Sequence, residues 1–434
     1  MNNALPLTLQ DCRRLDRDDP LAPLREQFVL PHDEIYLNGN SLGALPRAAP
    51  ERLRQVIEHE WGRDLTRSWS QAGWTDLPQR LGDRIAPWVG AGPGEVVVGD
   101  STSVNLYKVL SAAAARVRAA GKGRSRIVSE RGNFPTDLYI AHSIARQHGM
   151  TLDLLDAPAD PAQLDDSVAM LLLSHVDYRS GYLHDLAATT AAAHRAGALM
   201  IWDLAHSAGA VPVDLLGADA DYAVGCGFKY LNGGPGAPAF VWAHPRHVAS
   251  DRQPLTGWMG HATPYAFDGD YVAAPDASRY LCGTPALLSM SALACGLDGF
   301  DRLRELGGMA ALRDKSLALT TLFMQQVDAY AGRYGLRCIT PADPARRGSQ
   351  VSYVVDQGGA GIVQALMARR VIANLRAPDV LRFGFTPLYL GYAQAWQAAE
   401  QLRQVLQHGE WRDGAAVTGA SGQAGASPPR VPRP

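Results

Sequence analysis

Residues 201–236 read IWDLAHSAGAVPVDLLGADADYAVGCGFKYLNGGPG, and Lys229 lies in them between an apolar run and a glycine-rich turn. The run DYAVGCGF is typical of a short buried strand, and YLNGGPG is typical of a turn in which backbones approach closely. Lysine is rare here, since arginine supplies nearly all the other positive charge. A lysine partly withdrawn from water is suited to Schiff-base chemistry. On this stretch alone, a lysine that extends to the surface beside a loop is an equally good interpretation.

Asp203 favours the chemical interpretation of Lys229. It ends the apolar run 199–202, which is typical of a parallel strand, and open α/β sheets bind ligands at the carboxyl ends of such strands. A lysine and a carboxylate in one pocket match the needs of pyridoxal phosphate. The amine binds the aldehyde, and the carboxylate keeps the pyridine nitrogen protonated so that the ring accepts electrons. Taken alone, Asp203 is equally explained as the cap of a turn.

Strands and helices alternate over the first 240 residues, which predicts an α/β fold with a mostly parallel sheet covered on both faces. Polar or aromatic residues recur where the expected strands end, so several βα units are expected to contribute to one site. These residues are Ser103, Phe134, Ser174, Asp203 and Lys229.

Two of these strand ends suggest specific contacts. The run 100–103, DSTS, lies between a strand and a helix, where free N–H groups and the helix dipole bind phosphate; a simple helix cap is the competing explanation. Phe134 lies in a glycine- and proline-containing loop from which its ring can stack on a planar ligand. Trp69 is a similar candidate for stacking on an aromatic substrate, although most buried tryptophans belong to the core.

The composition is that of an ordinary globular protein. The chain has 434 residues, enough for two domains, and its net charge of −2 gives no indication of binding to nucleic acid or to an anionic membrane. No apolar run approaches the length of a membrane span. The first residues lack the pattern of an export signal, and the five cysteines lack metal-type spacing. We therefore expect a cytoplasmic protein with reduced thiols and no bound metal.

The pattern changes after residue 242. Residues 251–285 are rich in loop-forming residues, and a loop this long inside a compact domain is usually functional. Helices are expected near 286–304 and 308–333, followed by mixed strands and helices that predict a small α+β domain. The chain is thus divided into an N-terminal arm with a substrate loop (1–45), a large cofactor-binding domain (46–300), a small C-terminal domain (301–411) and a disordered tail rich in Pro, Gly and Ser (412–434).

Arg382 is a charged residue within the apolar strand LRFGF of the small domain. A guanidinium in such a strand requires an anionic partner. A substrate carboxylate held by two parallel hydrogen bonds satisfies this requirement, and a structural ion pair satisfies it equally well.

Several segments together closely resemble the kynureninase family of pyridoxal-phosphate hydrolases with fold type I. The lysine motif is shared by many aminotransferase relatives, whereas YLNGNSLG, NFPTD and GWMGH are far more specific. The resemblance extends from about residue 36 to 392 and rests on YLNGNSLG (36–43), STSVN (101–105), NFPTD (133–137), WDLAHSAGAVP (202–212), FKYLNGGPG (228–236), GWMGH (257–261) and LRFGFTPLY (381–389).

The resemblance implies hydrolysis of the Cβ–Cγ bond of L-kynurenine, or its 3-hydroxy form, to the anthranilate and L-alanine, as in tryptophan catabolism and NAD biosynthesis. It implies a homodimer with shared active sites, a pyridoxal phosphate bound to Lys229 and a pyridinium paired with Asp203. The cofactor set is Thr102, Ser103, Phe134, Pro135, Thr136, Asp137, Ser174, Asp203, His206, Phe228 and Lys229, with Trp258 and Thr284 from the second subunit. Thr102, Ser103 and Asp137 are expected near the phosphate, and the substrate residues are Asn40, Ser41, Trp69 and Arg382.

Phe228 departs from the family pattern, which usually has tyrosine at this position. The ring is kept and a hydroxyl donor to the phosphate is lost, at a cost of roughly 1.5–3 kcal/mol for a hydrogen bond to a charged group. Two alternatives to a fully active kynureninase therefore remain. One is a cofactor-binding variant with impaired catalysis, and the other is a different enzyme of the same fold, such as a cysteine desulfurase or a class V aminotransferase. A desulfurase needs a mobile nucleophilic cysteine, which neither Cys226 nor Cys282 resembles.

Overall fold

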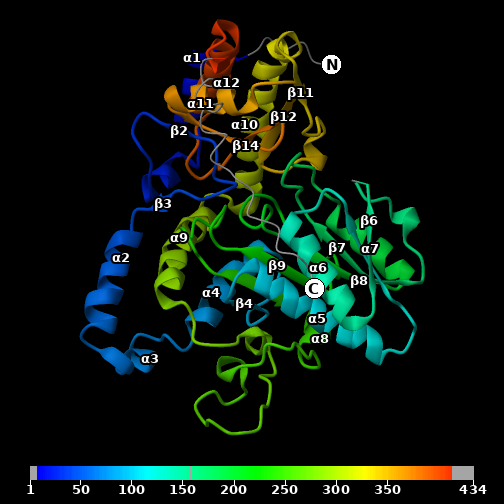
Figure 1. Cartoon of the computed structure of the whole chain (residues 1–434). Helices are drawn as coiled ribbons and strands as arrows, with labels where there is room; N and C mark the ends of the chain where they lie inside the picture. The colour runs from blue at the N-terminus through cyan, green and yellow to red at the C-terminus, as the bar shows by residue number, and fades with distance from the viewer. Residues whose placement is uncertain (1–6, 157, 413–434) are drawn as a thin grey trace, which may run out of the picture.

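The structure, a computed structural model, describes residues 7–156 and 158–412. A large α/β part occupies the lower half of Figure 1, and a smaller part, which holds the first and last helices, lies above it. The predicted tail from residue 413 onward lies outside the described residues.

A seven-stranded sheet forms the centre of the large part. Its order is β4-β10-β9-β8-β7-β5-β6, and the strands from β9 to β6 are parallel to one another. Only β10 runs antiparallel to both of its neighbours, so the expected mostly parallel sheet is confirmed. The strands are β4 (Val96–Val98), β5 (Arg126–Glu130), β6 (Thr151–Leu155), β7 (Val168–Ser174), β8 (Leu199–Asp203), β9 (Tyr222–Cys226) and β10 (Ala239–Ala243).

Both faces of this sheet are covered, as the almost continuously apolar strands require. Alternate residues of β7 point into different cores: Met170 and Leu172 pack with α5 and α6, whereas Leu171 and Leu173 face the opposite core. The helices of the large part are α2 (Ala49–Gln55), α3 (Ser68–Gln71), α4 (Leu77–Ile85), α5 (Thr102–Ala119), α6 (Pro135–His148), α7 (Leu186–Ala196), α8 (Pro245–Val248) and α9 (Leu287–Glu305).

The small part is an α+β unit, as expected. Four antiparallel strands form a sheet in the order β11-β12-β15-β14, and Arg382 lies in the buried strand β15. Helix α1 packs against α12, so the N-terminal arm is joined to this unit, and α9 continues through residue 300. The elements are α1 (Leu9–Arg17), α10 (Gly308–Ala331), α11 (Gly359–Ala368), α12 (Tyr392–His408), β11 (Leu336–Cys338), β12 (Gln350–Val355), β13 (Val371–Ile372), β14 (Asn374–Arg376) and β15 (Val380–Gly384).

Residues 28–46 follow the N-terminal arm, and within them residues 38–43 lie between the two parts. This segment begins with β1 (Phe28–Val29), continues through β2 (Ile35–Tyr36), which pairs with β13, and ends at β3 (Leu45–Pro46). Gly43 N donates to the carbonyl of Phe228 at 2.8 Å, and a Cβ at Gly43 would lie only 2.4 Å from the carbonyl oxygen of Lys229. Glycine is therefore needed for this segment to approach the lysine turn.

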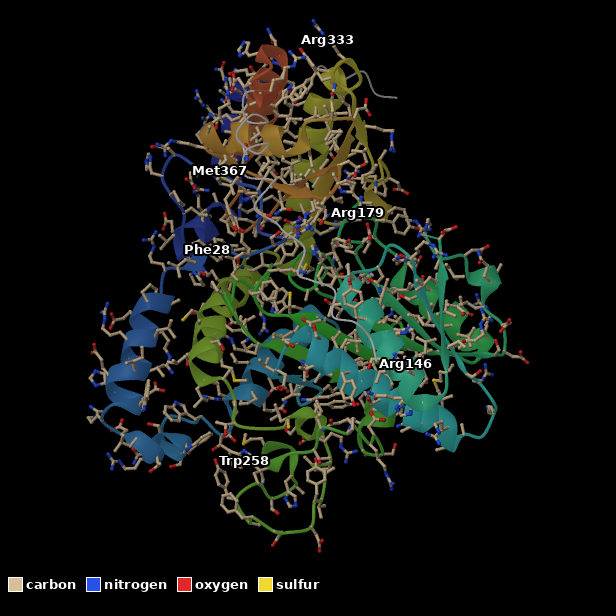
Figure 2. All side chains as sticks on the ribbon, in the orientation of Figure 1. Phe28, Arg146, Arg179, Trp258, Arg333 and Met367 are labelled. Atoms are coloured by element: carbon tan, nitrogen blue, oxygen red, sulfur yellow. The ribbon has the colours of Figure 1, made fainter. Side chains whose placement is uncertain are left out.

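Residues 251–285 form the expected loop-rich segment. Its only helical turns are η6 (Trp258–Gly260) and η7 (Ala277–Tyr280). Met259 N of η6 donates to the carbonyl of Cys282, two residues after η7, at 3.2 Å. Figure 2 shows Trp258 on this segment at the lower end of the molecule, opposite Met367 of the small part. Within the described ranges, no helix combines the length and apolar character that a membrane crossing requires.

Candidate active site

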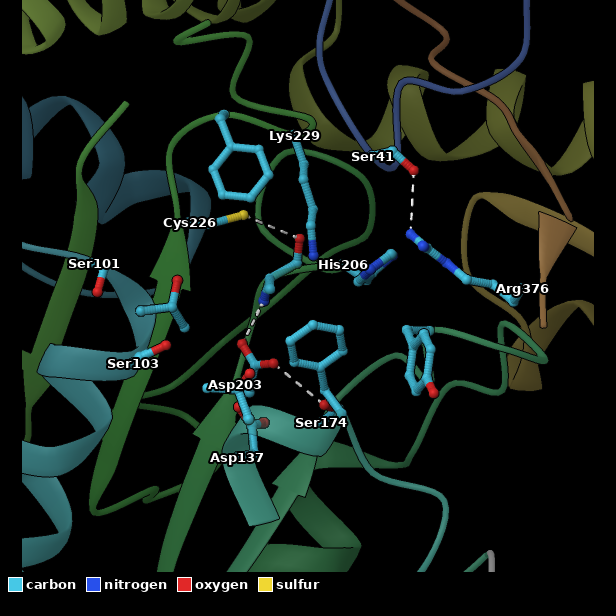
Figure 3. A pocket seen from close by; sticks show the side chains of 16 residues that line it. Ser41, Ser101, Ser103, Asp137, Ser174, Asp203, His206, Cys226, Lys229 and Arg376 are labelled. Carbon is cyan, nitrogen blue, oxygen red and sulfur yellow. Dashed lines mark hydrogen bonds between the residues drawn. The ribbon is translucent and has the colours of Figure 1, made fainter. Parts of the chain in front are cut away.

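A cavity of about 310 Å³ lies where β7, β8 and β9 end and where α5 and α6 begin. It is the region drawn in Figure 3, where side chains of the large part meet Ser41 of the segment between the parts and Arg376 of the small part. The lining residues are Ser41, Ser101, Thr102, Ser103, Phe134, Thr136, Asp137, Ser174, Tyr178, Asp203, Ala205, His206, Cys226, Phe228, Lys229 and Arg376.

Lys229 projects into this cavity from the turn that follows β9, and its ammonium ends beside His206 (Figure 3). The turn is closed by hydrogen bonds from Asn232 N to the Lys229 carbonyl at 3.0 Å and from Gly233 N to the Gly227 carbonyl at 2.8 Å. The Lys229 Nζ lies 5.7 Å from the ring centroid of Phe228 and 5.9 Å from that of Phe134. The amine is thus held between aromatic rings, within reach of a planar ligand.

Asp203 ends β8 with a buried carboxylate. Its Oδ1 accepts from Ala205 N at 2.8 Å and its Oδ2 accepts from the Ser174 hydroxyl at 3.2 Å. Burial raises the pKa of Asp203, although the Lys229 ammonium opposes this change. The pair of groups predicted from the spacing of Asp203 and Lys229 therefore lies in one cavity.

Asp137 lies against Asp203 below it in Figure 3. Burial, and then the neighbouring Asp203 charge, raise the pKa of Asp137 well above its usual range, so the two carboxyl groups retain a proton between them. Asp137 lines the same cavity as Thr102 and Ser103, and its nearness to a bound phosphate stays a prediction. Within the described residues, its closest charged neighbour is the carboxylate of Asp203.

His206 is buried, and its Nδ1 has no hydrogen-bond partner among the described residues. Burial, and then the nearby Lys229 charge, lower the pKa of His206 well below its usual range. The imidazole is therefore neutral and able to donate or accept one hydrogen bond with a ligand in the cavity.

The first turn of α5 forms the opposite end of the cavity. The Ser101 hydroxyl caps the helix by accepting from Val104 N at 3.3 Å, and the first turn carries no acidic side chain. The N–H groups of Thr102 and Ser103 have no acceptor within the helix, because the first four N–H groups of a helix never do. Free N–H groups, hydroxyls and the helix dipole together suit a phosphate.

Arg382 is fully buried and pairs with no carboxylate in the described ranges. Its Nη1 donates to the Tyr178 carbonyl at 2.8 Å and its Nη2 to the Ser41 hydroxyl at 2.6 Å. Burial, and then the neighbouring Arg376, lower the pKa of Arg382 to about 9. Arg376 also donates to Ser41, at 3.4 Å, and the Nε of each arginine is unpartnered. Two guanidinium groups without a carboxylate form a strong anion site.

Comparisons with known proteins agree with this geometry. A family model described as the kynureninase C-terminal domain matches residues 312–402. A kynureninase of Burkholderia pseudomallei is 52% identical over 93% of this chain and 97% of its own length. The chain belongs to the kynureninase family. A kynureninase of Pseudomonas fluorescens, at 51% identity and the same coverage, supports this assignment.

Solved structures share the fold at much lower identity. An apo cysteine desulfurase from Thermococcus onnurineus NA1 has a TM-score of 0.73 at 17% identity, over 89% of this chain and 98% of its own. A C-DES K223A mutant with glycine covalently linked to the PLP cofactor has a TM-score of 0.72 at 19% identity, over 87% of this chain and 98% of its own. The predicted fold, that of the PLP-dependent enzymes of type I, is thus confirmed.

The residues present in the kynureninase-family chain fit pyridoxal phosphate. The cavity has an amine at its centre, a buried carboxylate on one side and a helix N-terminus on another. The buried Asp137 Oδ2 and His206 Nδ1 lack partners among the described residues, so polar atoms remain to meet a ligand. Phe134 forms an aromatic wall, packed edge-on against Tyr178 with ring centroids 5.4 Å apart.

Most of the predicted residues line this cavity, but six do not. Pro135 begins α6 outside the lining, and Asn40 is buried with its Nδ2 donating to Gln350 Oε1 at 3.1 Å. Arg382 reaches the cavity edge through Ser41. The remaining three are Trp69, Trp258 and Thr284.

Trp69 and Trp258 belong instead to an aromatic cluster at the lower end of the molecule, with ring centroids 5.9 Å apart. Trp258 also packs on Tyr265 and Phe267, whose side chains are largely exposed, and Thr284 is exposed as well. Within one chain none of the three lines the cavity. For Trp258 and Thr284 this is the arrangement expected if they complete a site in a second subunit.

Ser101 belongs to the predicted run 100–103, and four lining residues were not predicted from the sequence: Tyr178, Ala205, Cys226 and Arg376. Tyr178 follows Ser174 in the loop after β7, and its position after a strand was a usable signal. Arg376 and Arg382 lie on adjacent antiparallel strands and on the same face, since Asn374 pairs with Arg382 and Arg376 pairs with Val380. Recognition of this strand pair would have placed the second arginine beside the first.

Proposed function

We propose that this chain is a kynureninase that hydrolyses the Cβ–Cγ bond of L-kynurenine to give anthranilate and L-alanine, with pyridoxal phosphate as cofactor. The observation that carries the proposal is the projection of Lys229 into a cavity that Asp203 also lines, in a member of this family. When bound, the cofactor supplies a ring that stabilises negative charge on the substrate carbon that bears the amino group.

The residues of the chain divide the remaining tasks. Lys229 would hold the cofactor through its aldehyde, and its amine would move protons to and from the substrate carbons. Asp203 holds a proton at the pyridine nitrogen. The first turn of α5 would hold the phosphate, and the ring of Phe134 would stack on the cofactor.

Arg382 and Arg376 bind the α-carboxylate of the amino acid, with Ser41 fixing their orientation. The two arginines carry positive charge and meet no carboxylate of the described residues. The carboxylate of an amino acid is therefore expected to point toward the small part. The aromatic group of kynurenine then points away from these arginines. Trp69 is proposed to border this group. Residues at the same end of the site are proposed to determine the preference between kynurenine and its 3-hydroxy form.

Two active sites are proposed to form at the interface of a homodimer. Support comes from Trp258 and Thr284, which family members are expected to contribute from the second subunit and which lie outside the cavity of their own chain. Nearby large apolar side chains are exposed, with Trp61 58% and Phe267 76% accessible in the single chain. A second copy that covers these side chains explains their exposure. We also propose a cytoplasmic location, which the five free cysteines support. The proposed role is in tryptophan catabolism.

A cysteine desulfurase is the alternative that needs the clearest exclusion, since the structural neighbours include one. The cysteine that lines the cavity, Cys226, is buried at the end of β9, and burial raises its pKa. A buried neutral thiol on a rigid strand is a poor nucleophile. The direct test supplies kynurenine and cysteine separately to the purified holoenzyme and follows anthranilate fluorescence and sulfide. Anthranilate alone is expected, and sulfide alone would contradict the proposal.

A further inference from the structure

Lys108 is a buried lysine that the proposed chemistry does not use. It lies in α5, less than two turns after the helix begins, and its side chain is 0% exposed. Its Nζ donates to Asp100 Oδ2 at 2.5 Å and to the carbonyl oxygen of Tyr280 at 2.5 Å. A buried ammonium is costly unless it is paired in this way, so the arrangement has to offset that cost.

Asp100, the partner of Lys108, directly precedes the phosphate-binding turn. Its φ of +50° lies in the left-handed region, which few residues other than glycine adopt. Its carbonyl accepts from Ala239 N at 2.9 Å, and Asn105 Nδ2 donates to the adjacent Gly99 carbonyl at 2.9 Å. The backbone is thus fixed so that the next residue, Ser101, caps α5. An unpaired carboxylate here would oppose a phosphate bound at the same turn.

The second partner of Lys108 connects this turn to the loop-rich segment. Tyr280 ends η7, and its hydroxyl donates to the buried Asp251 at 2.7 Å. Gly99 packs closely on the same segment, since a Cβ there would lie 3.0 Å from Leu281 Cδ2. The chain then continues to Thr284. Lys108 therefore joins the start of α5 to the segment proposed to serve the second subunit.

We propose that Lys108 is a positioning residue for the cofactor phosphate: it neutralises Asp100 beneath the first turn of α5 and ties that turn to the segment 277–281. The inference rests on the proposed cofactor site, but it concerns cofactor affinity and not the reaction catalysed. Lys108 does not line the cavity, so its effect passes through Asp100 and the backbone of residues 99–103.

The test compares Lys108→Met with Lys315→Met. Lys315 is a matched control because it is also buried, pairs with Asp19 at 2.7 Å and donates to the Pro387 carbonyl at 2.7 Å, but lies in the small part. Both variants are expected to melt at lower temperature. Only Lys108→Met is expected to lose affinity for pyridoxal phosphate, by about tenfold or more, in equilibrium dialysis of the holoenzyme followed by absorbance. Equal affinity in the two variants would overturn the inference.

Two further variants separate the charge from the fold. Lys108→Met combined with Asp100→Asn removes the unpaired carboxylate and is expected to recover most of the lost affinity; no recovery would refute charge neutralisation. Asp100→Asn alone keeps a residue that tolerates the left-handed backbone and leaves the ammonium in place. It is expected to bind the cofactor about threefold more tightly, with a steeper salt dependence, and weaker binding would contradict the inference even if Lys108→Met does not fold. Kynurenine turnover by the unchanged chain, measured in parallel, tests the proposed function separately.

Discussion

The guanidinium of Arg382 donates through Nη2 to the hydroxyl oxygen of Ser41 at 2.6 Å, a contact between residues 341 positions apart in the chain. The same guanidinium is fully buried and meets no carboxylate among the residues that the structure describes. A buried charge without a counterion destabilises the fold by itself. The buried charge of Arg382 is explained if the carboxylate of the substrate serves as its counterion.

Arg382→Gln should therefore raise the KM for kynurenine by about 10- to 100-fold, as expected for loss of a charged hydrogen bond worth roughly 1.5–3 kcal/mol. Steady-state kinetics by anthranilate fluorescence measures this change. The absorption of the bound cofactor serves as the control and should remain, because Arg382 does not touch the cofactor end of the cavity. Arg376→Gln is the matched variant, with a smaller effect because its contact with Ser41 is longer, at 3.4 Å. An unchanged KM in Arg382→Gln would remove the arginine from the substrate site.

The proton held by Asp137 predicts a pH dependence of stability. Burial, and then the Asp203 charge, raise the pKa of Asp137 well above its usual range, so the folded protein keeps a proton that the unfolded chain releases. The stabilisation is complete below the ordinary carboxyl pKa of about 3.9 and is lost as the pH rises through the raised pKa. Asp137→Asn, which cannot titrate, should lose less stability than the wild type as the pH rises above the ordinary carboxyl range. Urea unfolding of the cofactor-free proteins measures the difference, and parallel pH profiles would show that Asp137 carries no such proton.

The sequence predicted the centre of the site better than its edges. Asp203 and Lys229 were placed together because the carboxyl ends of parallel strands share one edge of a sheet, which the alternation of apolar strands and helices makes visible. The direction of β10 was not visible, since an antiparallel strand buried on both faces has the same apolar composition as its parallel neighbours. Tyr178 and Arg376 were missed although each had a signal in the sequence, a position just after a strand for Tyr178 and a strand next to that of Arg382 for Arg376.

Two sets of predicted residues show what a single sequence leaves open. The family resemblance places Asp137 with the phosphate residues, and the structure adds that it lies in the first turn of α6, where its carboxyl meets Asp203. Trp258 and Thr284 belong to a long loop whose position relative to the cavity depends on the partner proposed to complete it. A single sequence gives the residue types of such a loop but not the chain whose site they enter.

Phe228→Tyr tests whether the missing hydroxyl limits this chain. The phenylalanine ring lines the cavity, so a hydroxyl on it can reach the bound cofactor. The restored hydrogen bond to the phosphate should tighten cofactor binding by about 10- to 100-fold. Equilibrium dialysis measures affinity, and saturating cofactor separates affinity from turnover. A rise in turnover of tenfold or more at saturation would instead identify the natural chain as a catalytically impaired variant, whereas unchanged turnover supports full activity with Phe228.

Shared active sites predict complementation between two inactive variants. A Lys229→Ala protomer keeps Trp258, and a Trp258→Ala protomer keeps Lys229. If Trp258 acts in the site of the partner subunit, a mixed dimer contains one complete site and one doubly defective site. After random exchange of subunits, about half of the dimers are mixed, and each mixed dimer has one intact site out of two. About a quarter of wild-type activity should therefore return. Activity no greater than that of the separate variants would place Trp258 in the site of its own chain.

The most direct test of the central claim is the formation of anthranilate from L-kynurenine by the purified chain, with and without the amine of Lys229. The wild type, supplied with pyridoxal phosphate, should show the absorption of a lysine-bound cofactor and release anthranilate. Lys229→Ala should lose that absorption and slow turnover by about 10²–10⁴-fold or more, the range for loss of a general acid–base group. Turnover retained by Lys229→Ala, or a wild type that binds the cofactor but releases no anthranilate, would contradict the account.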